Sequence, residues 1–71
     1  MYGLRIYKHT GNSGYLVIID TEVYLIGDGH NIHMGDRKDV ELLNSQEEVK
    51  IEGLPIQVLG GVMERLGAFI N

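Results

Sequence analysis

Polar and apolar residues alternate with a period of two over residues 2–7. Leu4 and Ile6 point to one side of this segment, while Arg5 and Tyr7 point to the other. Side chains on a β-strand alternate between the two faces of the sheet in this way. The start of the chain therefore predicts a strand with one buried face.

Two further apolar runs follow, at 15–19 and 23–26. They are preceded by turn-forming segments at 9–14 and 20–22, which predict hairpin connections. Within the first run, residues 16–19 leave no polar face. Such a continuous β-prone run is typical of a central strand that is covered on both sides.

Asp28-Gly29 predicts the next hairpin, because Asp-Gly fits the type I′ turn that joins two strands. We expect residues 30–34 to pair back as a short fourth strand. Residues 48–52 alternate strictly between charged and β-branched residues, which predicts another strand with one wet face, placed at an edge of the sheet.

Residues 37–47 fit two patterns. In one, Asp36 caps a helix that carries Val40 and Leu43 on the same side. In the other, which we favour, a strand through Val40 precedes a polar turn at 44–47.

The end of the chain predicts a helix over 54–70, with Pro55 at its first helical position, where a missing N–H costs nothing. We expect Gln57, Glu64 and Arg65 to face water. Apolar residues recur at spacings of three and four and predict one amphipathic stripe. The stripe consists of Ile56, Leu59, Met63, Leu66 and Ile70, widened by Val58, Val62 and Phe69.

Three glycines interrupt this helix, and each costs about 1 kcal/mol relative to alanine in a helix interior. Gly60 and Gly67 lie seven residues apart and therefore on nearly one side, where a bare backbone allows close approach. We expect them to contact the protein's own sheet. The alternatives are a self-association seam, or a shorter helix that starts near Val62 after a strand over 56–59.

These elements together predict an α+β fold. An antiparallel β-meander of four to six short strands occupies about 1–52, and one C-terminal amphipathic helix over 54–70 packs on a face of the sheet. A chain of 71 residues has room for a single small domain, 1–71, and shows no internal repeat or linker.

Composition narrows the classes of function. The chain is 44% hydrophobic, has a net charge of −4 and contains no cysteine, which excludes disulfides and a thiolate nucleophile. No apolar run is long enough to span a bilayer, and the first residues lack the layout of a signal peptide, so we expect a cytoplasmic protein with no membrane contact. Lys and Arg are not clustered, which argues against nucleic-acid binding.

One segment carries residues that could bind a metal. Asp28, His30, His33 and Asp36 combine two imidazoles and two carboxylates, which are ligands for zinc and other divalent ions. Residues three apart on a strand face opposite ways, however, so the two imidazoles would diverge. A polar hairpin is the interpretation we favour, and a divalent-metal or small-ligand site is the alternative.

Four tyrosines lie on the first three predicted strands and could anchor a protein interface or pack within the fold. They are Tyr2, Tyr7, Tyr15 and Tyr24. Catalytic motifs and phosphate-binding loops are absent from the sequence, and we expect no enzyme activity and no cofactor.

The strands at 16–19 and 23–26 are apolar on both faces, whereas one helix covers only one face. We therefore predict a small, acidic, non-enzymatic protein-interaction module that forms a homodimer. Its size suits an accessory or inhibitory protein that occupies a partner's surface, of the kind that a virus or mobile element encodes.

Overall fold

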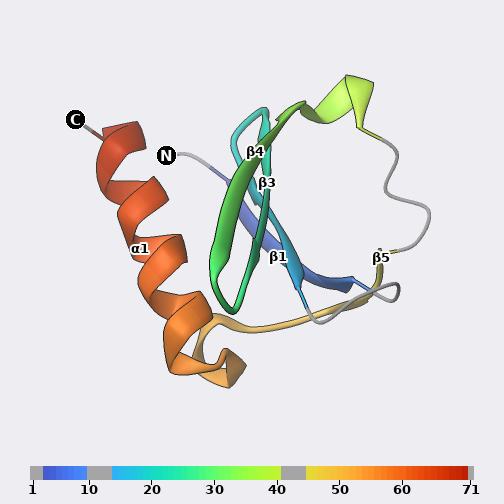
Figure 1. Cartoon of the computed structure of the whole chain (residues 1–71). Helices are drawn as coiled ribbons and strands as arrows, with labels where there is room; N and C mark the ends of the chain where they lie inside the picture. Colours follow the sequence, from blue (N-terminus) through green and yellow to red (C-terminus); the bar gives the residue numbers. More distant parts are fainter. Residues whose placement is uncertain (1–2, 10–13, 41–44, 71) are drawn as a thin grey trace.

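The computed structural model describes residues 3–9, 14–40 and 45–70. Its elements are β1 (Leu4–His9), β2 (Tyr15–Ile19), β3 (Glu22–Gly27), β4 (His30–Asp36), the 3-10 turn η1 (Arg37–Asp39), β5 (Ser45–Glu48), the 3-10 turn η2 (Ile51–Gly53) and α1 (Ile56–Ile70). The five strands form one antiparallel sheet in the order β4-β3-β2-β1-β5, and α1 packs along one face of it (Figure 1). This confirms the predicted α+β fold. In the described part of the chain, no helix is long and apolar enough to cross a membrane.

The first four strands form the predicted meander. The β3–β4 hairpin closes with Gly27 opposite His30, as expected from Asp28-Gly29 between them. A type I′ turn requires a positive φ at both central residues, but only Gly29 has one, at 84°. The predicted turn type is therefore wrong, although the hairpin itself is present.

The second half of the meander differs from the prediction. Ser45–Glu48 is strand β5, where we expected a turn, and the chain leaves the sheet after Val49 to form η2, where we expected a strand. Pairing with β1 explains the shift, because Lys8 lies opposite Glu47 and the Val49 N–H donates to the Ile6 carbonyl at 2.8 Å. Backbone hydrogen bonds hold the ladder at this edge, and hydrophobic periodicity does not indicate them.

The helix considered for residues 37–47 is wrong, because η1 spans only Arg37–Asp39 and Ser45–Glu48 is a strand, whereas the strand considered through Val40 falls mainly on residues that the structure does not describe. Asp36 does act as a cap, since its side chain accepts a hydrogen bond from the Lys38 N–H at 3.0 Å, but the capped element is the short turn η1. Residues 41–44, which include Leu43, lie outside the described residues.

One hydrophobic core lies between the sheet and α1. Its fully buried members are Ile6, Val17, Ile19, Ile26, Leu54, Val58 and Val62. The helix begins at Ile56, and the Pro55 carbonyl accepts its first hydrogen bond, from the Leu59 N–H at 2.9 Å. The helix is therefore confirmed, although it starts two residues later than predicted and Pro55 precedes its first residue; the shorter helix starting near Val62 is wrong.

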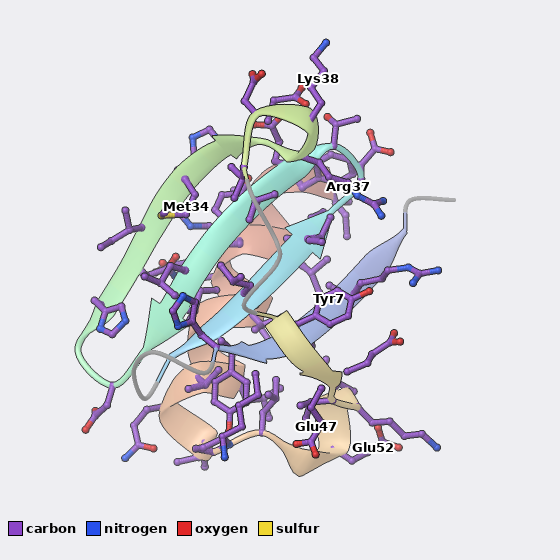
Figure 2. All side chains as sticks on the ribbon, turned by 90° about the vertical axis from the view of Figure 1, so that its right-hand side faces the viewer. Tyr7, Met34, Arg37, Lys38, Glu47 and Glu52 are labelled. Carbon is purple, nitrogen blue, oxygen red and sulfur yellow. The ribbon has the colours of Figure 1, made fainter. Side chains whose placement is uncertain are left out.

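A second cluster covers the opposite face of the sheet. Leu16, Ile18 and Val23 are at most 4% exposed, and Tyr7, Leu25 and Val40 pack against them. Figure 2 looks onto this face, with α1 behind the sheet. A single chain thus buries both faces of its central strand, as predicted for residues 16–19. Ile32 on the edge strand β4, opposite Leu25, stays half exposed on this face, so its cover by a second molecule stays a prediction.

Candidate functional site

The phase of the helix differs from the prediction. Val58 and Val62 are buried against the sheet, whereas Ile56, Met63 and Ile70 are 80%, 55% and 62% exposed. Leu59 and Leu66 are partly buried and pack against the same core. The apolar stripe is therefore buried along one margin and exposed along the other.

The exposed group continues a regular line. Ile56, Gly60, Met63, Gly67 and Ile70 follow one another at spacings of four, three, four and three. Residues at these spacings lie above one another on a helix surface, and this line is called the outer seam below. In Figure 1 the side of α1 away from the sheet faces no described element.

The glycines of α1 have two different environments. A Cβ on Gly61 would lie 2.8 Å from Ile26 Cγ2 and 3.2 Å from Asn31 Nδ2, so this glycine allows the helix to approach the sheet. A Cβ on Gly60 or Gly67 would meet nothing within 4 Å. The expectation that Gly60 and Gly67 contact the protein's own sheet is wrong, and Gly61 makes that contact instead.

A polar clamp joins α1 to the edge strand β4. The Arg65 guanidinium donates from Nε to Asn31 Oδ1 at 2.7 Å and from Nη2 to the Asn31 carbonyl at 2.9 Å. Asn31 Nδ2 in turn donates to the Gly61 carbonyl at 3.3 Å and to Glu64 Oε1 at 3.4 Å. The expectation that Arg65 faces water is wrong, because its guanidinium donates to Asn31 and joins the helix to the sheet.

The clamp extends along β3 and β4. The Arg65 guanidinium lies 4.7 Å from the centre of the Tyr24 ring, and the Tyr24 ring lies 5.0 Å from the His33 imidazole. His33 Nε2 is 2.7 Å from Glu22 Oε1, at the surface. Cation–π contacts of this kind add about 0.5–1 kcal/mol at exposed sites. This row of side chains is a connection between elements and does not enclose a cavity.

The four predicted metal ligands do not converge. The His30 side chain covers Gly27, whereas His33 contacts Tyr24 and Glu22, so the two imidazoles diverge as the strand period indicates. Asp36 caps η1, and Asp28 is exposed in the hairpin turn. Among residues 3–9, 14–40 and 45–70, no three His, Asp or Glu side chains gather where they could hold a metal ion.

The tyrosines are divided between the two faces of the sheet. Tyr15 and Tyr24 pack against the core under α1, and Tyr7 packs on the opposite face. Tyr7 also accepts a hydrogen bond from Arg5 Nη1 at 3.3 Å, which together with the nearby Glu48 carboxylate raises the pKa of the Arg5 guanidinium. Tyr2 lies outside the described residues. The three described tyrosines therefore do not form one binding surface.

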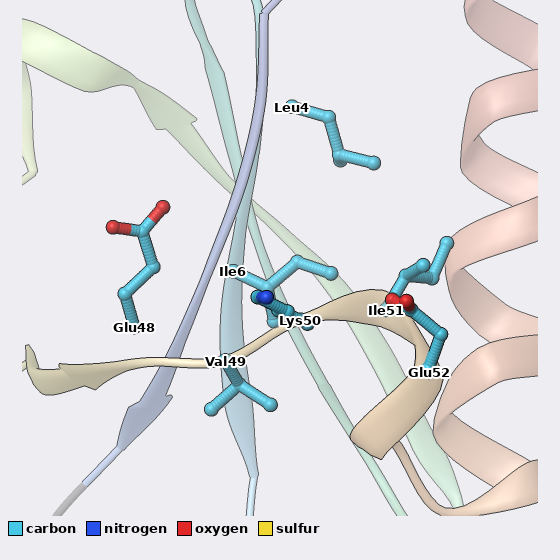
Figure 3. Close-up of a pocket in the computed structure, with 7 residues that line it drawn as sticks. All are labelled: Leu4, Ile6, Glu48, Val49, Lys50, Ile51 and Glu52. Atoms are coloured by element: carbon cyan, nitrogen blue, oxygen red, sulfur yellow. The ribbon is translucent and has the colours of Figure 1, made fainter.

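A pocket of about 560 Å³ opens beside β1 where the chain leaves β5 for η2. Leu4, Ile6 and Ile51 point to the α1 side of this pocket, and Glu48 lies on the other side of β1 (Figure 3). Val49, Lys50 and Glu52 complete its lining. Because charged groups of both signs surround an apolar floor, the lining does not select one class of ligand.

The chain matches no protein-family model, and comparison with curated proteins and with solved structures found no match. The outer seam of α1, the clamp and the pocket are therefore interpreted from their own chemistry.

Proposed function

We propose that this protein is a small, non-enzymatic interaction module that self-associates through the outer seam of α1. The observation that supports this proposal best is the exposure of Ile56, Met63 and Ile70 on one line of a helix whose opposite side is buried in the core. Full burial of an Ile or Met side chain contributes about 1.5–3 kcal/mol. Because these three side chains are more than half exposed in the monomer, most of this stabilisation is not realised within one chain.

The two seam glycines support the same proposal. Gly60 and Gly67 each cost the helix about 1 kcal/mol relative to alanine. Packing within the chain explains Gly61, but it does not explain these two, since a Cβ at either position would meet open space. A second helix that approaches closely along the seam gives both glycines a role.

The charge of the seam favours a second copy of this chain as the partner. Two molecules that each carry a net charge of −4 repel one another, and an uncharged surface is where this repulsion opposes contact least. The five seam residues carry no charge. Glu64, which lies beside them on the helix, is engaged by the Asn31 amide at 3.4 Å.

The size of the seam sets the strength of the expected dimer. A helix of 15 residues is about 22 Å long. A standard interface buries about 800 Å² on each partner, roughly one sixth of the 4667 Å² surface of this molecule. One helix face falls below that area, so we expect a weak, concentration-dependent dimer.

Sedimentation equilibrium tests the proposal. Between about 10 μM and about 1 mM, the range of a weak complex, the wild-type chain should shift from monomer to dimer. Met63→Lys should weaken the association at least tenfold, or about 1.4 kcal/mol, because it places a charge in the centre of the seam. Circular dichroism should show that this variant is folded, since Met63 is more than half exposed in the monomer.

Ile32→Lys is the matched control. Ile32 is a half-exposed apolar residue on β4, opposite Leu25 and therefore on the face of the sheet away from α1. The same change at this position should leave the dimer intact. A wild-type chain that stays monomeric at 1 mM, or an association lost in Ile32→Lys and kept in Met63→Lys, would contradict the proposal.

A further inference from the structure

The first half of β1 lies at an open edge of the sheet. β5 pairs with β1 only over Tyr7–His9, and beyond this ladder the Val49 N–H donates to the Ile6 carbonyl at 2.8 Å. The chain then leaves the sheet for η2. In the described part of the chain, no strand lies beside Leu4 on this side of β1.

The main-chain groups of Leu4 point to this open edge. Successive residues of a strand direct their N–H and C=O groups to opposite sides. Gly3 faces β2, because its carbonyl accepts a hydrogen bond from the Asp20 N–H at 2.8 Å, whereas Ile6 faces Val49. Leu4 lies two residues before Ile6 and therefore faces the same side. Among the described residues, its N–H and C=O have no main-chain partner, which leaves one donor and one acceptor for an added strand.

The opposite edge of the sheet is less suited to an added strand. On β4, the Asn31 carbonyl already accepts a hydrogen bond from Arg65 Nη2 at 2.9 Å, and the register with β3 shifts between Val23 and Tyr24. Engaged carbonyls and bulges of this kind hinder further pairing. The register of β1 with β2, in contrast, is regular.

The pocket of about 560 Å³ lies beside the open edge of β1. Leu4, Ile6 and Ile51 line it on the α1 side (Figure 3). Directly opposite residues of two paired strands direct their side chains to the same face, so a residue opposite Leu4 would direct its side chain to this apolar lining. The lining alone does not select one class of ligand, but the main chain next to it selects an extended peptide.

The other face of the same edge carries a cation. Arg5 alternates with Leu4 along β1, and its Nη1 donates to the hydroxyl of Tyr7, which packs on the face away from α1. The Arg5 side chain is exposed. In an added strand, the residues on each side of the one opposite Leu4 fall on this face. Opposite charges on adjacent strands attract, so acidic residues are complementary there.

We infer that the open edge at Leu4 binds an extended segment of a partner protein as an additional antiparallel strand, with an apolar residue opposite Leu4 and an acidic residue on each side of it. In strand addition, main-chain hydrogen bonds provide affinity and a pocket selects the side chain. The antiparallel orientation continues the pairing of β5 and lets one residue bond both main-chain groups of Leu4. This inference does not depend on self-association through the outer seam.

An NMR titration with the capped peptide TEIET tests the inference. The isotope-labelled full chain is kept below the concentration at which it associates. We expect the amide signals of Leu4 and Ile6 to shift, with a dissociation constant of about 1 mM, because one hydrogen-bonded residue and one pocket side chain barely exceed the cost of ordering the peptide.

Two N-methylated peptides are matched controls for the main-chain contact. A methyl group on the isoleucine nitrogen removes the N–H that faces Leu4 and should weaken binding about tenfold. A methyl group on the nitrogen of the second glutamate, which points away from β1, should leave binding unchanged. If the two methylated peptides bind equally well, the peptide is not added as an antiparallel strand.

Leu4→Pro tests the same bond from the side of the protein. It removes the N–H at the open edge and none that bonds to β2, a position where a strand tolerates proline. Leu4→Ala controls for the lost side chain, and circular dichroism checks that both variants fold. Leu4→Pro should bind TEIET about tenfold more weakly than Leu4→Ala, and equal binding would contradict the inference.

A charge exchange tests the acidic flanks. Arg5→Glu should bind TEIET more weakly than the wild type and should bind TKIKT more tightly. Arg37→Glu makes the same change at an exposed position in η1 and should bind both peptides as the wild type does. Equal effects of the two variants would show that net charge, and not Arg5, sets the preference.

The site and the seam are distinguished by Met63→Lys, which should bind TEIET with the affinity of the wild type. Loss of dimerisation with peptide binding intact overturns self-association only. Absence of shifts at Leu4 and Ile6 with about 5 mM peptide, or shifts confined to β4 or α1, overturns the strand-addition site only.

Discussion

The three glycines of α1 have different surroundings. Gly61 faces the sheet, where Ile26 and Asn31 occupy the space that a Cβ would need. Gly60, one residue earlier, faces open space, and so does Gly67. Glycine costs the helix about the same free energy at each position. A difference in the free energy of unfolding between the alanine variants therefore reflects the surroundings of each glycine.

Alanine substitution should therefore have opposite effects at neighbouring positions. Gly60→Ala should raise the free energy of unfolding by about 0.5–1 kcal/mol, because it removes the conformational penalty of glycine without a clash. Gly61→Ala should lower it by about 1–2 kcal/mol, since overpacking against the buried Ile26 outweighs the same gain. Urea denaturation below the association range measures both values. Equal stabilisation of the two variants would mean that the helix does not approach the sheet at Gly61.

At the level of elements, the sequence predicted the first four strands and the helix, but neither the bounds of β5 nor the orientation of the helix. Apolar residues lie on two sides of α1, and a period near 3.6 does not indicate which side is buried. The small Val58 and Val62 are buried beside Gly61, while the larger Ile56 and Met63 remain outside. Small residues on the buried side allow the helix to lie close to the sheet. The hydropathy of the residues does not indicate which side allows this close approach.

The clamp was not predictable from periodicity either. Arg65 and Asn31 are 34 residues apart, and nothing local to either residue indicates the other. Asn31 was considered only as part of a polar hairpin, and Arg65 only as a solvated charge. Their contact follows from β4 being the edge strand next to the helix, where the Asn31 carbonyl is free to accept a donor from α1.

Loss of the clamp should destabilise the fold without removing an element. Arg65→Gln should lower the free energy of unfolding by about 1.5–3 kcal/mol, because it removes the charged donors to Asn31 in a partly buried setting. Arg65→Lys should recover only a small part of this, since an ammonium lacks the planar fork that reaches both Asn31 oxygens.

Arg37→Gln is the control, because it removes the same charge from an exposed position in η1. Urea denaturation of the three variants at equal ionic strength makes the comparison. If Arg37→Gln is as damaging as Arg65→Gln, net charge and not the clamp is responsible.

At the scale of the whole molecule, both faces of the sheet are covered within one chain. Leu16, Ile18 and Val23 are buried on one face, and the core under α1 occupies the other. The central strands β2 and β3 are therefore covered, and the large apolar side chains that stay exposed lie on the outer seam of α1 and on the edge strand β4, where Ile32 and Met34 are about half exposed. Ile56, Met63 and Ile70 lie outside both buried clusters, so substitutions on the seam test association separately from the packing of the core.

This separation leads to a prediction for the intact molecule. If the folded chain dimerises and the unfolded chain does not, raising the concentration to tenfold above the dissociation constant stabilises the fold by about 1.4 kcal/mol. For a domain of this size, that free energy corresponds to an increase in Tm of roughly 6–11 °C. The double variant Gly60→Ala/Gly67→Ala should melt at a higher temperature than the wild type in dilute solution, since it improves the helix.

The double variant should also lose the dependence of Tm on concentration, because the added methyl groups keep a second helix from approaching the proposed seam closely. Differential scanning calorimetry over the concentration range used for sedimentation measures both effects. Helix propensity alone raises the Tm of the variant equally at every concentration. If the seam binds a second copy, the difference in Tm between the variant and the wild type should shrink as the protein is concentrated. A difference in Tm that stays constant would show that the two glycines have no part in association.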